Sequence, residues 1–115
     1  YSGRMLAVLH IRSKPMLAGA KDQSCVNCGV SDGTVVAAHY TGLRSHLLGK
    51  GKGIKCDDLM VADLCFKCHN AFDVGYDGSS FEKKIDLSEQ FLYLIARTLL
   101  RRVDQGIITV KGHKP

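Results

Sequence analysis

The chain has 115 residues, of which 45% are hydrophobic and 23% are charged, so it suits one folded domain rather than a disordered segment. No apolar run reaches the about eighteen residues of a membrane-spanning helix, which predicts a soluble cytoplasmic protein with no membrane partner. A formal charge of +5 favours a polyanionic partner without identifying one.

The first forty residues predict a helix, a cysteine turn and a strand. Ser13 is a suitable N-cap and Pro15 suits a first helical turn, so a short helix is expected over residues 13–21. The segment TVVAAHY, residues 34–40, is apolar and β-branched, which is typical of a buried strand. This strand is expected to end at His39, where a loop begins.

The middle of the chain predicts a basic loop, a second strand and a helix. Residues 41–55 contain four glycines and four basic residues, a composition typical of a loop. The segment LMVADL, residues 59–64, predicts a strand that leads directly into a second cysteine pair. Helical spacing follows from Cys65, and Gly75 is a plausible stop for that helix.

The last third of the chain predicts a linker and one long amphipathic helix. Asp86 and Glu89 resemble a capping box, so the helix is expected over residues 87–105, with Gly106 after it. Its predicted apolar face consists of Phe91, Leu92, Ile95, Leu99 and Val103. The β-branched segment IITV, residues 107–110, predicts a short closing strand.

Four of the five cysteines form two C-x-x-C pairs, Cys25 with Cys28 and Cys65 with Cys68. Two residues between cysteines let a turn aim both sulfurs at one ion, and four thiolates complete a tetrahedral zinc site. A closed site has no open coordination position, so this zinc is expected to stabilise the fold without doing chemistry. Redox-active dithiols are the alternative. Cys56 lies outside both pairs and is expected to be a free thiol.

His69 follows the second cysteine pair directly, and Asp73 lies four residues further along the expected helix. That spacing places both side chains on one helix face, where they can bind a second metal ion. Taken alone, the motif also fits a solvated surface pair.

The order of these motifs resembles the HNH endonucleases, whose fold is also called the His-Me finger or ββα-metal fold. The pattern is a C-x-x-C pair, a strand ending in histidine, a loop, a second strand, and a C-x-x-C-H that opens a helix. The segments AAHYTG, DDLMVADLC and CHNAFD are similar to the small nucleases encoded by phages and prophages, the YbcO-like group. The resemblance covers residues 25–73, near half of the chain.

The resemblance implies both a fold and an activity. The implied fold is α+β, with a zinc-stapled ββα-metal core over residues 25–75 and flanking helices at 13–21 and 87–105. These parts are expected to form a single domain over residues 1–115. The implied activity is divalent-metal-dependent hydrolysis of phosphodiester bonds in DNA, in recombination or processing, within a bacterial host cell.

The resemblance also assigns roles to three side chains. It makes His39 the general base, which takes a proton from water at physiological pH. It makes His69 and Asp73 ligands of the catalytic metal, which is Mg²⁺ or another divalent ion such as Mn²⁺, Ni²⁺ or Zn²⁺. This metal would bind a scissile phosphate oxygen and stabilise the leaving 3′ oxyanion.

The chain departs from the family pattern at two positions. Many HNH enzymes carry a metal ligand just before the catalytic histidine, whereas this chain has Ala38. The missing ligand is Asp58 or Asp57, or water and phosphate replace it, or the enzyme is inactive. Asp58 is also the nearest match to the middle residue of the HNH pattern, because Asn70 lies beside His69 on the helix. A solvated turn before the strand is the alternative for both aspartates.

Basic side chains in the loop are expected to contact the DNA backbone. The candidates are Arg44, His46, Lys50, Lys52 and Lys55. Contacts with the DNA backbone do not read the base sequence, so weak sequence preference is expected. The expected substrate is double-stranded or branched DNA. Arg97, Arg101 and Arg102 either extend this surface or complement the dipole of the last helix.

Two other function classes compete with the enzyme. A non-catalytic zinc module that binds nucleic acid or a protein partner is favoured by Ala38. Redox sensing by the cysteines is the third hypothesis. The oligomeric state is left open, since the apolar face of the last helix suits either a core or a dimer.

Overall fold

The protein is built on a two-stranded antiparallel sheet, and the computed structural model describes residues 9–75 and 78–114. In chain order the elements are α1 (Lys14–Ala18), β1 (Val36–His39), the 3-10 helix η1 (Ser45–Leu48), β2 (Val61–Leu64), α2 (Phe66–Val74) and α3 (Phe81–Asp104). This is a small α+β fold, the class expected from the sequence. None of the helices in the described part is both long and apolar enough to cross a membrane.

The pairing of the two strands sets the two ends of the sheet. Val36 lies opposite Leu64, and His39 lies opposite Val61. All four residues of β2 are buried, whereas β1 has exposed, half-buried and buried positions. His39 therefore lies at one end of the sheet, and Cys65, directly after β2, lies at the other.

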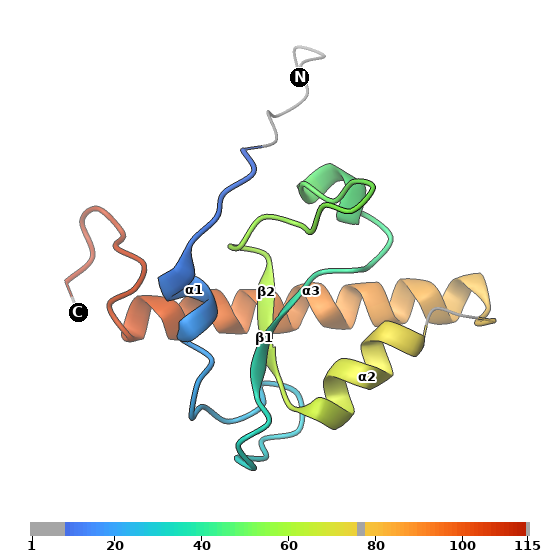
Figure 1. Cartoon of the computed structure of the whole chain (residues 1–115), viewed down its shortest axis with the longest axis horizontal. Helices are drawn as coiled ribbons and strands as arrows, with labels where there is room; N and C mark the ends of the chain where they lie inside the picture. Colours follow the sequence, from blue (N-terminus) through green and yellow to red (C-terminus); the bar gives the residue numbers. More distant parts are fainter. Residues whose placement is uncertain (1–8, 76–77, 115) are drawn as a thin grey trace.

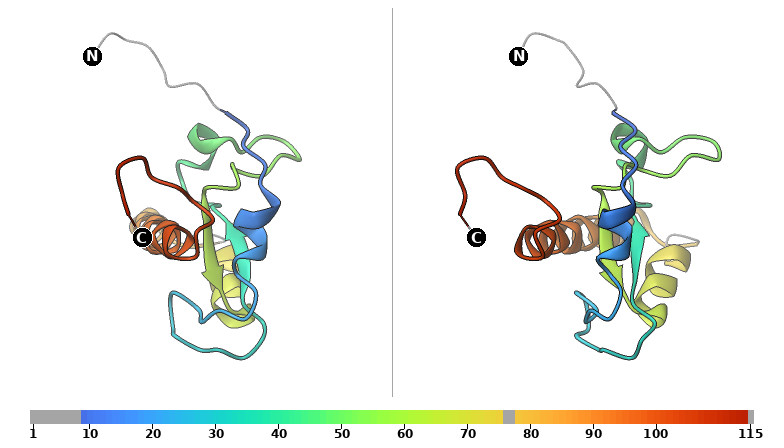
Figure 2. Two further views of the ribbon diagram at one scale, coloured as in Figure 1. Left: turned by 90° about the vertical axis from the view of Figure 1, so that its left-hand side faces the viewer. Right: turned by 60° about the vertical axis from the view of Figure 1, so that its left-hand side comes forward.

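The helices cover the sheet from different sides. In Figure 1, α3 passes behind the strands, with α1 and α2 to either side of them. The right-hand view of Figure 2 shows α3 on one side of the sheet and α2 on the other. The segment 25–33 lies at the lower end of the strands in Figure 1, and the loop 41–55 lies at the upper end. The sheet thus separates the cysteine end from the basic loop.

Aromatic contacts join α3 to the rest of the core. Phe91 on α3 is fully buried, and its ring packs edge-on against Tyr40 with centroids 5.3 Å apart. The ring centroid of Phe72 on α2 lies 4.9 Å from the ring centroid of Phe91. Such pairs stabilise beyond their buried area by about 1 kcal/mol each. Phe91 therefore fixes α3 against both the end of β1 and α2.

A buried ion cluster joins β2 to α3. Asp63 on β2 has no exposed surface and accepts hydrogen bonds from Arg101 at 2.9 Å and Arg102 at 2.8 Å. Arg102 is fully buried as well, and its Nε donates to the Met16 carbonyl at 2.8 Å. A Cβ atom at Gly19 would lie 2.6 Å from Arg102 Nε, so only glycine leaves room for this side chain. Both arginines therefore stabilise the core, and Arg102 has no exposed surface with which to contact a nucleic acid.

Several predicted helix ends are confirmed, and the predicted lengths are less accurate. The Ser13 hydroxyl caps α1 by accepting a hydrogen bond from the Met16 N–H, and Gly75 is the C-cap of α2. The helix predicted over 13–21 ends at Ala18, because the chain leaves the helix through turns that lead to the first cysteine pair. The first strand likewise spans only Val36–His39.

Two predictions for the last third of the chain are wrong. The long helix begins at Phe81 rather than at residue 87, because the Ser80 hydroxyl caps it by accepting a hydrogen bond from Lys83 N. The expected linker is therefore partly helical. The strand predicted over 107–110 is irregular, since the sheet within the described residues has only two strands and offers this segment no partner.

Candidate functional site

The four paired cysteines meet beyond one end of the sheet. Their Sγ atoms all lie within 4.8 Å of one another, and those of Cys28 and Cys65 are 3.7 Å apart. Cys25 and Cys28 come from the turn before β1, whereas Cys65 is the N-cap residue of α2, without a side-chain cap hydrogen bond, and Cys68 lies in the first turn of that helix. In the described part of the chain, this is the one group of three or more potential ligands that could hold a metal ion.

The spacing of the sulfurs fits tetrahedral zinc. Zinc–sulfur bonds of about 2.3 Å place two sulfurs about 3.8 Å apart, close to the distance between Cys28 and Cys65. Burial and the neighbouring thiols raise the pKa of Cys68 to about 12, so a cation is needed for all four sulfurs to ionise together. Asn27 Nδ2 also donates to Cys68 Sγ at 3.3 Å, which orients a ligand. The cluster is a possible metal site compatible with structural zinc.

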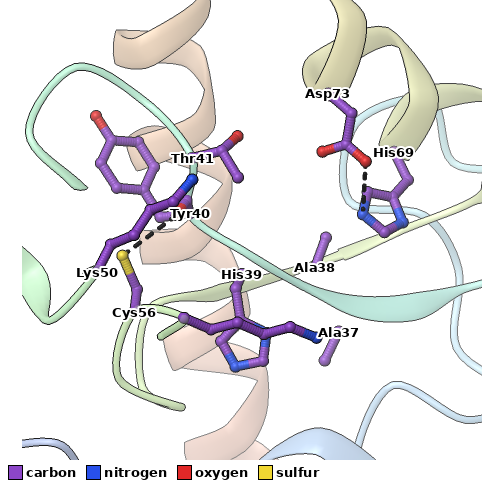
Figure 3. Close-up of a pocket in the computed structure, with 10 residues that line it drawn as sticks. Ala37, Ala38, His39, Tyr40, Thr41, Lys50, Cys56, His69 and Asp73 are labelled. Carbon is purple, nitrogen blue, oxygen red and sulfur yellow. Dashed lines mark hydrogen bonds and ion pairs between the residues drawn. The ribbon is translucent and has the colours of Figure 1, made fainter. Parts of the chain in front are cut away.

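A second group of polar side chains lines a cavity of about 410 Å³ beside β1. His39 reaches it from the end of β1, and His69 and Asp73 reach it from α2 (Figure 3). Lys50 and Lys55 line the same cavity from the basic loop. The predicted base, the predicted metal ligands and two of the predicted DNA-binding cations therefore line one cavity, and in the view of Figure 3 the His39 ring lies on the other side of the β1 ribbon from the His69–Asp73 pair.

His39 is held by a carboxylate rather than by the other cavity residues. Its Nε2 lies 2.7 Å from Asp58 Oδ1, and its side chain is only 14% exposed. An ionised carboxylate only accepts hydrogen bonds, so Nε2 carries the proton in this pair. In the neutral ring, Nδ1 then holds the free lone pair. This arrangement leaves His39 able to accept a proton at Nδ1.

Asp58 is buried, so the solvated-turn alternative is wrong for this residue. It is 4% exposed, and its Oδ2 accepts a hydrogen bond from Ser13 N at 2.7 Å. Burial alone would raise the pKa of Asp58, but the hydrogen bonds from His39 and Ser13 outweigh it and lower that pKa below its ordinary value. Asp58 therefore stays ionised at neutral pH. It does not line the cavity that holds His69 and Asp73.

His69 and Asp73 form an exposed pair on one face of α2, as their spacing predicted. His69 Nε2 lies 3.3 Å from Asp73 Oδ2, and the two side chains are 36% and 48% exposed. Magnesium is commonly bound by one or two carboxylates and completed by water and substrate phosphate. His69 and Asp73 could therefore supply two ligands to a divalent ion whose other ligands are water and phosphate. Ala38, which is buried and lies between this pair and His39 in the view of Figure 3, offers no third ligand.

The remaining residues predicted to bind DNA are not all near His39. Arg44 and His46 line a different cavity of about 700 Å³, which η1 and the start of α3 enclose. Lys52 is exposed on the turn between Gly51 and Ile54, which pair with each other. The basic loop therefore presents two separate surfaces, of which only the one with Lys50 and Lys55 adjoins the predicted base.

Cys56 is a buried free thiol, as expected from its place outside the two pairs. Its Sγ donates to the Tyr40 carbonyl at 3.2 Å, and it lines the cavity beside His39. Burial raises the pKa of this thiol, so it stays protonated at neutral pH. Its contacts indicate a packing role.

Sequence reasoning missed the segment before α1 as part of the site. Arg12 donates to the carbonyls of Lys55 at 3.0 Å and Cys56 at 3.1 Å, and Ser13 N donates to Asp58. These partners are separated by 43 to 45 residues along the chain. No spacing pattern marks contacts of that range, so only the folded structure reveals them.

Compared with known proteins, the chain matches no protein-family model, no curated protein and no solved structure. Its function is therefore inferred from its own residues and their geometry. Two arrangements carry that inference: the four-cysteine cluster and the cavity that contains His39.

Proposed function

We propose that this chain is a divalent-metal-dependent endonuclease that hydrolyses phosphodiester bonds in DNA, as the resemblance of its motifs to the HNH family implies. The main support is that His39, His69 and Asp73 line one cavity together with Lys50 and Lys55. A base, two potential metal ligands and two cations in one cavity are the groups that phosphodiester hydrolysis requires. The four-cysteine cluster would take no part in the reaction.

His39 acts as the general base in this proposal. Its Nε2–H donates to Asp58, so Nδ1 is the atom that takes the proton from water. Asp58 fixes the tautomer and the orientation of the ring, and its charge stabilises the imidazolium that forms. Asp58 is thus a positioning residue, which differs from the metal-ligand role expected from the sequence.

His69 and Asp73 would hold the catalytic ion. When bound, the ion supplies Lewis-acid stabilisation of the charge that develops on the phosphate and on the leaving 3′ oxygen. Lys50 and Lys55 neutralise the phosphate as the strand approaches the cavity. Such contacts recognise the backbone and not the bases, so weak sequence preference is expected.

A non-catalytic zinc module that binds nucleic acid is the second candidate, and Ala38 is the observation that favours it. The side chain at position 38 is 1% exposed and has no donor atom for a metal. A site with two protein ligands depends on water and phosphate for the rest of its coordination. In a binding module the same cavity would hold a phosphate group without cleaving it.

A plasmid-nicking assay separates the two candidates. Wild type, His39→Ala and the matched control His113→Ala would be incubated with supercoiled plasmid and Mg²⁺, Mn²⁺ or Ni²⁺. His113 is exposed near the end of the chain and does not line the His39 cavity. We expect His39→Ala to lose about 10²-fold or more in nicking rate, the usual contribution of a general base, while His113→Ala keeps the wild-type rate.

The same proteins would be compared in a DNA-binding assay. The nuclease proposal predicts that His39→Ala binds DNA as tightly as wild type. Equal nicking by wild type and His39→Ala would contradict the base assignment. DNA binding by wild type without nicking in any of the three metals would favour the non-catalytic module.

A further inference from the structure

A second cavity, of about 440 Å³, also has His39 in its wall. Lys55 lines both this cavity and the first one, whereas Arg12 lines the second cavity alone. The two cavities are therefore neighbours that share His39 and Lys55. A linear ligand that reaches the first cavity has a second polar cavity beside it.

Three backbone carbonyls hold the Arg12 guanidinium in place. Its Nη1 donates to the carbonyls of Ile11 at 3.0 Å and Cys56 at 3.1 Å, and its Nη2 donates to that of Lys55 at 3.0 Å. A guanidinium has five N–H groups, so these bonds leave two for a ligand. The side chain is 47% exposed and remains accessible. Arg12 is thus a positioned cation with free donors.

The charge of the second cavity suits an anion. Its walls contain the cations of Arg12 and Lys55 against one carboxylate, that of Asp58. Asp58 Oδ1 lies 3.8 Å from Arg12 Nη1 but only 2.7 Å from His39 Nε2, so this carboxylate is mainly engaged with the imidazole. Free guanidinium N–H groups beside an ammonium match the oxygens of a phosphate.

We propose that the second cavity binds another phosphate of the same nucleic-acid strand, so that the strand crosses His39 with one phosphate in each cavity. This inference rests on the proposed function, since it takes the first cavity as the place of cleavage. Leu17 and Ile54 line the second cavity and offer apolar surface to the sugar between the phosphates. The preferred substrate is therefore a polynucleotide rather than an isolated phosphodiester.

The charge requirement is tested by binding a fluorescein-labelled single-stranded oligonucleotide over a range of salt concentrations. Arg12→Gln is expected to reduce the slope of log affinity against log salt by about 0.7, because one contact with a single-strand phosphate is lost. Arg12→Lys keeps a cation and is expected to retain the wild-type slope. Lys14→Gln is the control, because Lys14 is an exposed cation of the same segment that lines neither cavity. A wild-type slope for Arg12→Gln, or equal slopes for Arg12→Gln and Arg12→Lys, would overturn the proposal.

The position of the second phosphate is tested by cleavage of oligonucleotides with one uncharged methylphosphonate next to the scissile bond, on its 5′ or its 3′ side. Wild type is expected to lose roughly tenfold in kcat/KM at one of these sides, the factor for one charge-assisted hydrogen bond. Arg12→Gln is expected to show no further loss at that side. If the methylphosphonate and Arg12→Gln each lowered kcat/KM and their effects multiplied at both sides of the scissile bond, the inference would be overturned.

The two proposals fail separately. If His39→Ala nicks plasmid as fast as wild type while Arg12→Gln still lowers the salt slope, the nuclease proposal is wrong and the phosphate site stands. If nicking requires His39 while Arg12→Gln binds with the wild-type salt slope, the second phosphate site is wrong and the nuclease proposal stands.

Discussion

The four-cysteine cluster and the His39 cavity lie at opposite ends of the same two strands, and they are held together in different ways. Three of the four cysteines are buried, and all four Sγ atoms lie within 4.8 Å of one another. In the cavity, His69 and Asp73 are 36% and 48% exposed, and His39 depends on Asp58 for its orientation. The cluster is closed and complete, whereas the cavity is open and lacks a third metal ligand.

The two sites also differ in how far apart along the chain their contacting residues lie. Each cysteine pair is local, because two intervening residues and one turn bring its sulfurs together. The His39 cavity depends on long-range contacts, since Ser13 and Arg12 hold the segment around Asp58. The first arrangement suits a structural metal site, and in the proposed function the second would position reactive groups that stay accessible to a substrate. Three substitutions and one pH series test this contrast.

The largest effect is expected for Cys65→Ser. Structural zinc contributes roughly 10 kcal/mol or more to folding, which equals the whole stability of a small domain, so this protein should not fold. Circular dichroism melting and zinc content by mass spectrometry measure the loss. Cys56→Ser is the control, because Cys56 lies outside the cluster and a serine hydroxyl can still donate to the Tyr40 carbonyl. The structural role of the cluster would be refuted if both variants melted at the same temperature.

The next largest effect is a loss of stability on substitution of Arg102. This side chain neutralises Asp63, which lies on β2, the strand that runs from one site to the other. Arg102→Met leaves the buried Asp63 carboxylate with Arg101 as its remaining partner and should destabilise the protein by about 3 kcal/mol. Urea unfolding measures this change. Arg97→Met on the exposed face of α3 should change stability by less than about 0.5 kcal/mol. Similar unfolding midpoints for the two variants would contradict the buried ion cluster.

A substitution of Asp58 should lower the cleavage rate without preventing the protein from folding. In Asp58→Asn the amide can donate to His39 Nε2, so the ring proton moves to Nδ1 and the base is lost. We expect the single-turnover cleavage rate to fall by about 10²-fold with DNA affinity unchanged. Asp104→Asn, at the exposed end of α3, is the control. Equal cleavage rates for these two variants would remove Asp58 from the mechanism.

The smallest effect is the dependence of stability on pH near Asp58. The folded-state pKa of Asp58 is lowered, so its ionised form contributes stability that is fully present above the unfolded pKa of about 3.9. That contribution is lost as the pH falls through the folded pKa. The difference in unfolding free energy between wild type and Asp58→Asn should therefore shrink below about pH 4. A difference that stayed constant to lower pH would mean that Asp58 is not held by these contacts.

The sequence predicted local features better than long-range ones. The Ser13 cap, the Gly75 stop and the closeness of the two sulfurs within each C-x-x-C pair follow from residues a few positions apart. The meeting of the two pairs, with Cys28 and Cys65 separated by 37 residues, could be predicted only because tetrahedral zinc requires four ligands. The start of α3 was missed, because Ser80 caps the helix inside a segment whose glycines and serines are typical of a linker. The prediction of a strand over 107–110 was wrong, because a segment of high β propensity forms a strand only where a neighbouring strand can pair with it.

The buried charges were the features that sequence patterns could not reveal. Arg102 lies on the inward face of α3 only because Asp63 is there to neutralise it, and that pairing spans 39 residues. The contact of His39 with Asp58 spans 19 residues and follows from the strand pairing together with the segment before α1. In both cases the partner decides whether a charged side chain can be buried.

The most direct test of the central claim is a crystal structure of His39→Ala with manganese and an uncleaved oligonucleotide, in which anomalous scattering locates the metal. The account predicts a manganese peak between His69 and Asp73, with a phosphate oxygen beside it and position 39 facing the same phosphate. Manganese bound elsewhere, or a strand that crosses a different face of the protein, would contradict the account.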